Sequence, residues 1–537
     1  MSRITLLQNG ISRTLEAEDG TNLHKLLQEN RIFLPAPCGG QGRCGKCLVT
    51  IGDAAGSRTV CACRTVIQGD CRVLLPDSSP LADSTQKGPY AARSEMSSGR
   101  TAAETGSFAA AVDLGSTTIT AALLGPEESS SLQALSDRPF SPVFSPYDTI
   151  TEWNCLIPYG SDVLSRVRYT MDHPEGLALF ASLLQKQVLE MLERLCRQKG
   201  LPGSSLTRLS LAGNTIMQHL FAGIDPSGMA AWPFRPRTLF REDEELVLHS
   251  EAFPALSCQL APCISAFIGG DITAGLAISP LPDSEETSLY LDIGTNGEMA
   301  LGSRRSLLCC SVATGPAFEG AEISCGMMGS AGAISHLSYD RRGFHTEVIG
   351  GGLPKGFCGS ALIDLLAILL QKGVIDGGGH LRPPREAPLL MKRLLTEDAN
   401  GNGCFHLPRF SSLVLTAEDV RRLQLAKASV AAGIDLLLKE SGKSYADIAH
   451  LYLAGSFGSH IDLQHAADIG LLPCPLLEKT VCLGNASLQG SLAALRSEGI
   501  RERIRTLPEK CRTLELGGDA GFQEFFLSHC SFDPFAV

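Results

Sequence analysis

Hydrophobic and polar positions alternate differently before and after residue 107. Residues 1–76 contain short alternating runs, RITLLQNG and ISRTLEA, then a helical stretch, TNLHKLLQENR, and a last apolar run, DCRVLLP. Alternation is typical of half-buried strands, so this region is predicted to be a compact β-rich domain with one helix. Residues 77–107 are mainly Ser, Ala, Gly and small polar residues without apolar periodicity, which predicts a flexible linker.

After the linker, one pair of patterns occurs twice in the same order. FAAAVDLGSTTITAALLG at 108–125 matches TSLYLDIGTNGEMALGS at 287–303: an apolar run, Asp, Gly, a hydroxyl residue and a second strand. LTRLSLAGNTIMQHL at 206–220 matches IAHLYLAGSFGSHID at 448–462, in which a strand ends in Ala-Gly. A repeated order of elements indicates two related structural units.

We therefore predict two α/β lobes, residues 108–285 and 286–537, and a multidomain α/β protein. Their strands are separated by amphipathic helices such as FASLLQKQVLEMLERLCRQ and AEDVRRLQLAKASVAAGIDLLLKE. The length of 537 residues and the 44% of hydrophobic residues agree with several buried cores.

Charge and cysteine content narrow the functional class. The net charge of −11 and the lack of a long Lys/Arg run argue against a nucleic-acid partner. The N-terminus lacks the apolar run of a signal peptide, and no stretch is long and apolar enough for a membrane span, so we expect a cytoplasmic protein. In that reducing compartment the 19 cysteines are expected to be thiols or metal ligands rather than disulfides.

The stretch PAPCGGQGRCGKCLV carries three cysteines on one loop, and a fourth follows on a predicted strand. Cys38, Cys44, Cys47 and Cys63 are separated by five, two and 15 residues. Three thiolates on a glycine-rich loop plus one from a neighbouring strand are typical of a 2Fe-2S ferredoxin site. Tetrahedral zinc and unliganded thiols are alternatives, and Cys61 is an alternative fourth ligand.

Two Asp-Gly turns, VDLGSTT and LDIGTNGE, predict phosphate contacts. Gly and Ser/Thr supply amide and hydroxyl donors for phosphate oxygens, while Asp113 and Asp292 can hold Mg2+ directly or through water. Asp271, in GGD, is a further carboxylate that could act on the metal or on water. The other predicted nucleotide contacts are Gly115, Ser116, Thr117, Thr118, Gly294, Thr295, Asn296, Gly297, Glu298, Gly315, Gly359, Ser360, Gly455, Ser456 and Gly458.

Several side chains have both a functional and a structural interpretation. Glu298 and Glu319 could position water or Mg2+, or could be ordinary polar partners at turns. His219 is interpreted as a hydrogen-bonded histidine of the core or of an interface, with a ligand of cobalt or another metal as the alternative. The cysteines of apolar or glycine-rich strand ends are interpreted as core thiols: Cys309, Cys310, Cys325 and Cys358.

The two turns and LAGSFGSHID resemble the phosphate and adenosine motifs of the superfamily of acetate and sugar kinases, heat-shock 70 chaperones and actin. An N-terminal ferredoxin joined to such an ATPase resembles the reductive activators of corrinoid proteins. Longer phrases carry the same resemblance: YGSDVLSRV, AGNTIMQHLFAGIDP, TGPAFEGAEISCGM, GFCGSALID, QLAKASVAAGI and GNASLQG. The resemblance implies a β-grasp 2Fe-2S domain and a two-lobed, actin-like (ribonuclease H-like) ATPase.

The resemblance also implies a reaction: ATP-dependent transfer of one electron from the cluster to an inactive Co(II) corrinoid protein, giving Co(I) for methyl transfer. A low-potential electron donor, Mg2+, a homodimer and an anaerobic cell are implied with it. The chain departs from the family pattern at GMMG, residues 326–329, where Gly-Met-Arg-Ala is expected, and in the short segment between Cys47 and Cys63. A nucleotide-gated, chaperone-like protein for a corrinoid partner and a small-molecule kinase with a regulatory ferredoxin domain are the alternatives.

Overall fold

The computed structural model describes most of the chain. The described residues are 1–8, 11–30, 32, 34, 42, 47–53, 56–76, 108–125, 148–160, 162–242, 245–320, 322–458, 460–533 and 535. The predicted linker, 77–107, lies outside the described residues, as do Cys38 and Cys44. The predicted domain boundaries remain predictions.

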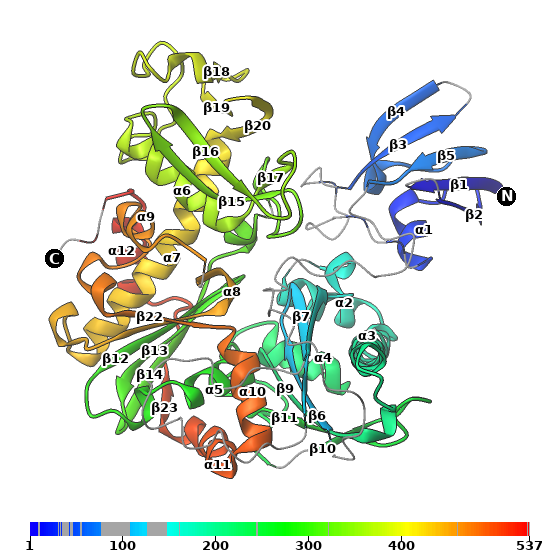
Figure 1. The fold of residues 1–537 in the computed structure, drawn as a ribbon, viewed down its shortest axis with the longest axis vertical. Helices are drawn as coiled ribbons and strands as arrows, with labels where there is room; N and C mark the ends of the chain where they lie inside the picture. Colours follow the sequence, from blue (N-terminus) through cyan, green and yellow to red (C-terminus); the bar gives the residue numbers. More distant parts are fainter. Residues whose placement is uncertain are drawn as a thin grey trace.

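The N-terminal region forms a five-stranded mixed sheet in the order β2-β1-β5-β3-β4 (Figure 1). Its elements are β1 Ser2–Gln8, β2 Ile11–Ala17, α1 Leu23–Glu29, β3 Leu48–Asp53, β4 Gly56–Cys61 and β5 Cys71–Leu74. Alternate residues of β1 point inward, and Ile4 and Leu6 are fully buried with Leu23 and Leu27 of α1. The one helix and the alternating strands agree with the sequence pattern.

The next six strands form the sheet of the first lobe, in the order β10-β11-β9-β6-β7-β8. Its elements are β6 Phe108–Leu114, β7 Thr118–Leu124, β8 Asp148–Trp153, α2 Val163–Asp172, α3 Gly176–Gln198, β9 Leu206–Gly213, α4 Thr215–Ala222, β10 Glu245–Leu248, β11 Leu256–Leu260 and α5 Gly270–Ile278. The apolar stripe of α3, which includes Phe180, Leu184, Val188 and Met191, is fully buried in this lobe's core.

The second lobe repeats the arrangement in a sheet of order β22-β21-β12-β13-β14-β23. Its elements are β12 Ser288–Ile293, β13 Asn296–Ser303, β14 Ser306–Ala313, α7 Ala417–Ser441, β21 Leu451–Ala454, α8 Gly455–Gly458, α9 Leu463–Asp468, β22 Thr480–Gly484, α10 Ala486–Arg496, α11 Glu498–Thr506, β23 Cys511–Thr513 and α12 Ala520–Ser528. A capping box between Thr416 and Asp419 begins α7 at the start of its amphipathic pattern.

An insertion of two small sheets separates β14 from α7 (Figure 1). It contains β15 Ala333–Asp340, β16 Gly343–Val348, β17 Gly356–Phe357, α6 Gly359–Gln371, β18 Leu395–Glu397, β19 Gly403–Leu407 and β20 Phe410–Thr416. The repeat in the sequence did not predict this insertion, because it has no counterpart in the first lobe.

The internal repeat corresponds to equivalent strand pairing in the two lobes. Strand β6 pairs antiparallel with β7 and parallel with β9, with Asp113 opposite Ala212. Strand β12 pairs antiparallel with β13 and parallel with β21, with Asp292 opposite Ala454. Both Asp-Gly turns are therefore hairpins at the same edge of their sheets, next to an Ala-Gly strand end.

Two helices cross between the lobes and join them. Leu488 and Leu492 of α10 pack on the first sheet, whereas Leu276 of α5 packs with Tyr290 of the second sheet. A Cβ at Gly490 of α10 would overlap the Ala274 carbonyl oxygen of α5, so the two helices lie in close backbone contact. Each lobe thus contributes a helix whose N-terminus lies near the hairpins.

Candidate functional site

The two hairpin turns meet across the boundary between the lobes. Thr117 Oγ1 lies 3.2 Å from Thr295 Oγ1, and Ser116 Oγ lies 3.5 Å from the same atom. Glu319 joins both turns, because its Oε2 accepts a hydrogen bond from Thr117 and its Oε1 accepts one from Thr295, each at 2.7 Å. The hydroxyl groups that the sequence assigned to phosphate contacts thus lie together.

Asp113 is held by α10. Asn485 Nδ2 donates to Oδ2 of Asp113 at 2.8 Å, and Ser487 Oγ donates to Oδ1 at 2.9 Å. Burial nevertheless outweighs these two hydrogen bonds and raises the pKa of Asp113. Sequence analysis did not identify Asn485 or Ser487, although both lie in the phrase GNASLQG.

Burial and nearby carboxylates raise the pKa of three further acidic side chains, Asp271, Asp292 and Glu298. Burial, followed by repulsion from Asp292, raises the pKa of Asp271 to about 8. Burial and then repulsion from Asp113 raise the pKa of Asp292 to about 7, and burial with both aspartates raises that of Glu298. Among the described residues, no side chain donates a hydrogen bond to the carboxylate of Asp271 or Asp292. Such an anionic cluster favours protons or a cation.

Direct metal ligation is a separate question. Within the described part of the chain, no three His, Cys, Asp or Glu side chains are arranged to hold a metal ion by themselves. A cation at this cluster would therefore complete its shell with water or ligand oxygens, as Mg2+ does in phosphate sites.

Buried donors hold the first hairpin turn from behind. Asn154 Nδ2 donates to the carbonyl oxygen of Gly115 at 2.8 Å, and the Asn154 amide donates to that of Thr117 at 3.0 Å. Arg166, whose side chain is fully buried, donates to the carbonyl oxygen of Ser116 at 2.6 Å. These three hydrogen bonds fix the backbone of the turn. Sequence analysis missed both residues.

The second turn is held in a similar way by Thr314, whose Oγ1 lies 2.8 Å from the carbonyl oxygens of both Gly294 and Thr295 and can donate its one hydrogen to either. Gly315 follows with φ +68°, a conformation that favours glycine. Thr118 begins β7, and Asn296 and Gly297 begin β13.

The third predicted motif, at β21 and α8, lies against the second turn. A Cβ at Gly455, which has φ +86°, would be 2.5 Å from Oδ1 of Asp292, so only glycine lets the chain pass this close to the carboxylate. Phe457 stacks on Phe318 with ring centroids 5.2 Å apart. Gly458 packs on Leu453. The Ser456 side chain lies outside the described part of the structure.

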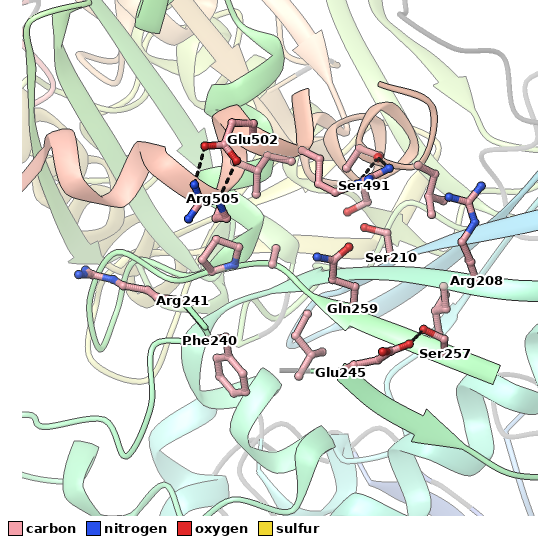
Figure 2. Close-up of a pocket in the computed structure, with 18 of the residues that line it drawn as sticks. Arg208, Ser210, Phe240, Arg241, Glu245, Ser257, Gln259, Ser491, Glu502 and Arg505 are labelled. Carbon is pink, nitrogen blue, oxygen red and sulfur yellow. Dashed lines mark hydrogen bonds and ion pairs between the residues drawn. The ribbon is translucent and has the colours of Figure 1, made fainter. Parts of the chain in front are cut away.

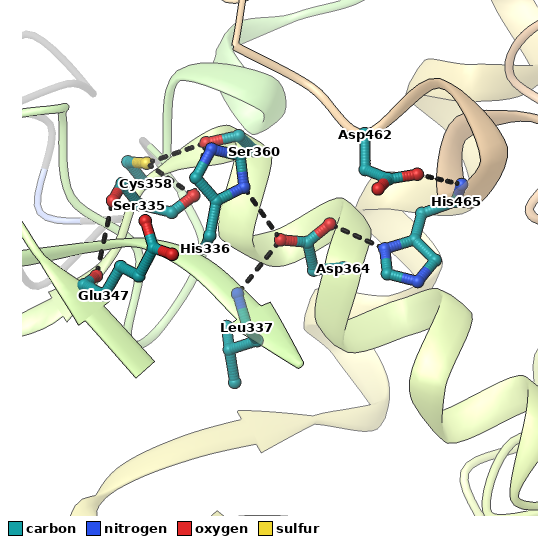
Figure 3. Close-up of polar contacts among 9 residues, drawn as sticks. All are labelled: Ser335, His336, Leu337, Glu347, Cys358, Ser360, Asp364, Asp462 and His465. Carbon is teal, nitrogen blue, oxygen red and sulfur yellow. Dashed lines mark hydrogen bonds and ion pairs between the residues drawn. The ribbon is translucent and has the colours of Figure 1, made fainter. Parts of the chain in front are cut away.

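Gly359 and Ser360 begin α6, on the side of the second lobe that carries the insertion. Gly359 packs on Phe318, whereas the Ser360 hydroxyl donates to the carbonyl oxygen of Ser335 at 2.7 Å (Figure 3). On the same helix, Asp364 accepts hydrogen bonds from His336 and His465 at 3.2 and 2.7 Å. These hydrogen bonds hold α6, α9 and β15 together. The Ser360 hydroxyl, which the sequence assigned to the nucleotide, thus donates its hydrogen bond to the backbone of the insertion.

In the N-terminal domain, the described part of the cysteine site brings two thiols together. Cys47 Sγ, which is fully buried, lies 3.2 Å from Cys63 Sγ. Two thiolates on one tetrahedral metal with bonds of about 2.3 Å lie about 3.7 Å apart. The two sulfurs are therefore neighbours, about 0.5 Å closer together than on a shared metal atom. Cys61 ends β4, one residue before the turn that carries Cys63. The two residues present fit an iron-sulfur site, and the other two predicted ligands lie outside the described residues.

Four further cysteines and His219 are buried, as their sequence context predicted. Cys309, Cys310 and Cys358 are at most 5% exposed, and Cys325 is 9% exposed. His219 is fully buried, with Nδ1 2.7 Å from the carbonyl oxygen of Thr215, and burial lowers its pKa.

A cavity of about 460 Å³ lies outside this site, between strands β9 and β11 and helices α10 and α11 (Figure 2). It adjoins Ser491 and Leu495 in the second half of α10, whereas Asp113 contacts the N-terminus of that helix. Its charged side chains include as many glutamates as arginines, and Arg505 pairs with Glu502. The convergence of carboxylates and hydroxyl groups, rather than cavity size, therefore identifies the candidate site.

No helix in the described ranges is long and apolar enough to cross a membrane.

The fold and site define a class of protein: a ferredoxin-type domain followed by a two-lobed α/β unit with paired phosphate-type hairpins. Family models agree. A 2Fe-2S iron-sulfur cluster binding domain matches residues 6–68, the RACo middle region matches 143–284, and the C-terminal ASKHA domain of RACo matches 286–535. The chain belongs to the RACo family, and its domains bind a 2Fe-2S cluster and a nucleotide.

Two curated relatives and one solved structure are similar. The corrinoid activation enzyme RamQ of Eubacterium limosum is 30% identical over 391 residues, 71% of this chain and 65% of that protein. The Co(II) methylated amine-specific corrinoid protein reductase of Methanosarcina barkeri is 26% identical over 64% of each chain. The chain thus spans just under two thirds of these relatives. A solved reductive activator for corrinoid, iron-sulfur protein has 27% identity and a TM-score of 0.69, over 98% of both chains.

Proposed function

We propose that this protein reduces the Co(II) form of a corrinoid methyl-carrier protein to Co(I), using one electron from its 2Fe-2S cluster and the hydrolysis of ATP. One observation supports this most: a pair of adjacent thiols and two hairpins whose hydroxyl groups meet between two lobes occur in one chain that matches a solved corrinoid activator over 98% of its length. The activity, partner and site residues are inferences for this chain.

On the electron-transfer side, Cys38, Cys44, Cys47 and Cys63 hold the cluster. The 3.2 Å separation of the Cys47 and Cys63 sulfurs favours Cys63 over Cys61 as the fourth ligand. When bound, the cluster carries one electron at a time, and plant-type clusters do so near about −400 mV. Reduction of Co(II) consumes that electron, and a low-potential donor returns the cluster to its reduced state.

On the nucleotide side, the turns at 115–118 and 294–297 bind the phosphates of ATP from opposite lobes. Asp271, Asp292 and Asp113 hold Mg2+ through water, because their carboxylates repel one another and are not arranged as direct ligands. Glu298 adds to the same negative field, and Gly455, Phe457 and Gly458 lie where the nucleoside would approach Asp292.

ATP is needed because cobalt reduction lies energetically uphill from such a cluster. Each 59 mV of uphill transfer of one electron requires about 1.4 kcal/mol. ATP shifts this balance only if the ATP-bound protein has a different affinity for the Co(II) and Co(I) partners. Phosphates bound by hairpins of both lobes would couple nucleotide binding to the contact between the lobes. A cytoplasmic location and a homodimer belong to the same proposal.

The test is an anaerobic titration of a Co(II) corrinoid protein with the full chain, reconstituted with iron and sulfide and reduced, with and without MgATP. The Co(I) absorbance band is followed. We expect Co(I) only with ATP. Cys63→Ser should lose the cluster absorbance and Co(I) formation but keep ATP hydrolysis, and Cys61→Ser is the matched control that keeps all three.

Other outcomes would contradict the proposal. Co(I) formation at the same rate without ATP would exclude a role for the two-lobed region in the reduction. ATP turnover with an intact cluster but no Co(I) would favour the chaperone-like or kinase alternatives, and phosphate transfer to a small hydroxyl compound would separate these two.

A further inference from the structure

A single carboxylate occupies the space between the two phosphate turns. Glu319, at the end of the short 3-10 helix Pro316–Glu319, accepts 2.7 Å hydrogen bonds from Thr117 of the first lobe and Thr295 of the second. The two hydroxyl groups are themselves 3.2 Å apart. Three side chains from three segments therefore close the boundary between the lobes.

Those same hydroxyl groups are the ones that we assign to the phosphates of ATP. A carboxylate that accepts two hydroxyl hydrogen bonds satisfies the donors in the way that two phosphate oxygens would. Each threonine hydroxyl has one hydrogen to donate, so it cannot donate to Glu319 and to phosphate at once. Two anions would also repel each other in this space. ATP and the Glu319 carboxylate thus compete for one position.

The backbone that carries Glu319 is fixed. Phe318 is 1% exposed and stacks on Phe457 at 5.2 Å, and a Cβ at Gly359 would overlap the Phe318 carbonyl oxygen. Gly320, at φ +76°, packs against the backbone of Met327. Close packing on both sides means that the carboxylate can leave by rotation of its side chain while the segment stays in place.

We propose that Glu319 is a latch that joins the two lobes when no nucleotide is bound, and that the phosphate groups of ATP open it by taking over Thr117 and Thr295. This inference rests on the ATP binding proposed above. Because part of the binding energy of ATP displaces the latch, the latch lowers the apparent affinity for ATP. It also makes the contact between the lobes depend on the phosphate group rather than on the nucleoside.

The first test measures ATP and adenosine affinity by calorimetry on the full chain with Mg2+. Glu319→Ala should bind ATP about tenfold more tightly or better, whereas adenosine, which has no phosphate, should bind as it does to the unchanged protein. Glu319→Gln keeps the shape without the charge and should show a smaller gain. Glu322→Gln is the matched control, since it removes the same charge three residues away and should leave both affinities unchanged.

The second test measures the latch without nucleotide, by hydrogen exchange of peptides that cover 113–118 and 292–297. Exchange in both peptides should be faster in Glu319→Ala, and saturating ATP should abolish the difference. Thermal unfolding of the Ala and Gln variants establishes that both are folded.

The outcomes separate the two proposals. If neither the unchanged protein nor the variants bind ATP, the proposed function fails. If the unchanged protein binds ATP and the Glu319 variants bind it equally or more weakly, the latch is wrong. Equal ATP binding with roughly 100-fold slower hydrolysis would instead make Glu319 the group that orients the attacking water.

Discussion

The two phosphate hairpins have the same turn, but the environments of their aspartates differ. Asp113 faces the N-terminus of α10 and accepts hydrogen bonds from Asn485 and Ser487. The charge of Asp292 instead acts on Asp271 of α5, whose pKa it helps to raise. Asp271 lies two residues after the N-cap of α5, and Ser487 has the same position in α10. The hairpin aspartate thus faces a hydroxyl group in the first lobe, where Ser487 lies beside Asp113. In the second lobe it faces a carboxylate, because Asp271 takes the equivalent position beside Asp292.

This difference indicates a division of labour. Two hydrogen bonds fix the Asp113 carboxylate, which therefore contributes to joining the lobes. The Asp271–Asp292 pair costs stability in the protein alone, because burial and repulsion raise both pKa values. Buried charges that destabilise a fold are typical of ligand sites, where they are kept because the function needs them. Four predictions test this comparison.

The largest expected effect concerns the two aspartates themselves. Asp292→Asn should lower ATP hydrolysis by roughly 100- to 1000-fold and yet raise the free energy of unfolding of the two-lobed region by about 1 kcal/mol, because a buried charge is removed. Asp113→Asn should lower that free energy by about 1 kcal/mol, because an amide has one acceptor oxygen in place of two and leaves the donor of Asn485 or Ser487 unpaired. Turnover assays and urea unfolding measure both. Stability changes of equal sign would contradict the comparison.

The second prediction concerns pH. The folded-state pKa values of Asp271 and Asp292, about 8 and about 7, lie above the ordinary value of 3.8, so the folded protein binds more protons than the unfolded chain between these values. Stability without ligand should therefore fall, not rise, as pH rises from about 4 to 8. Each unit by which a folded-state pKa is raised contributes about 1.4 kcal/mol, so the loss should amount to several kcal/mol.

Thermal unfolding across this pH range, with and without MgATP, measures the effect. Addition of MgATP should stabilise the protein more at pH 8 than at pH 5. Asp292→Asn should flatten the profile, and an unchanged slope in that variant would assign the pH dependence to other groups.

The third prediction exchanges the two environments. Asp271→Ser gives the second half the hydroxyl of the first, and should raise the free energy of unfolding by about 1 to 2 kcal/mol while ATP hydrolysis falls. Ser487→Asp places a second carboxylate beside Asp113 and should lower stability by about 2 kcal/mol. Urea unfolding of both variants measures the pair, and a loss of stability in Asp271→Ser would show that Asp271 makes a stabilising contact.

The smallest expected effect concerns Tyr290, which lies beneath α5. Its hydroxyl has no hydrogen-bond partner within the described residues, and it packs against Gly275 close to the carboxylates. Tyr290→Phe removes a buried unpaired group and should raise the free energy of unfolding by up to about 1 kcal/mol without changing hydrolysis. A loss of stability would indicate a buried partner for the hydroxyl.

Sequence patterns predicted much of the fold, because they report periodicity and repetition. The stripe of α3 and the capping box of α7 make these helices readable from local sequence. The turns at Asp113 and Asp292 and the strand ends at Ala212 and Ala454 could be matched as a repeat. The insertion between β14 and α7 could not, because it has no repeat, and the phrase GFCGSALID within it does not indicate how its strands pair.

The sequence by itself determined the chemistry available: four spaced cysteines, two Asp-Gly hairpins and an Ala-Gly strand end, since these depend on residue type and local spacing. Tertiary structure alone decided which groups meet. Asn485 is 372 residues from Asp113 along the chain, and Glu319 is 202 residues from Thr117. Contacts at such separations depend on how the sheets and crossing helices pack, because hydrogen bonds and charge repulsion act over distances in space and leave no periodic trace in the sequence.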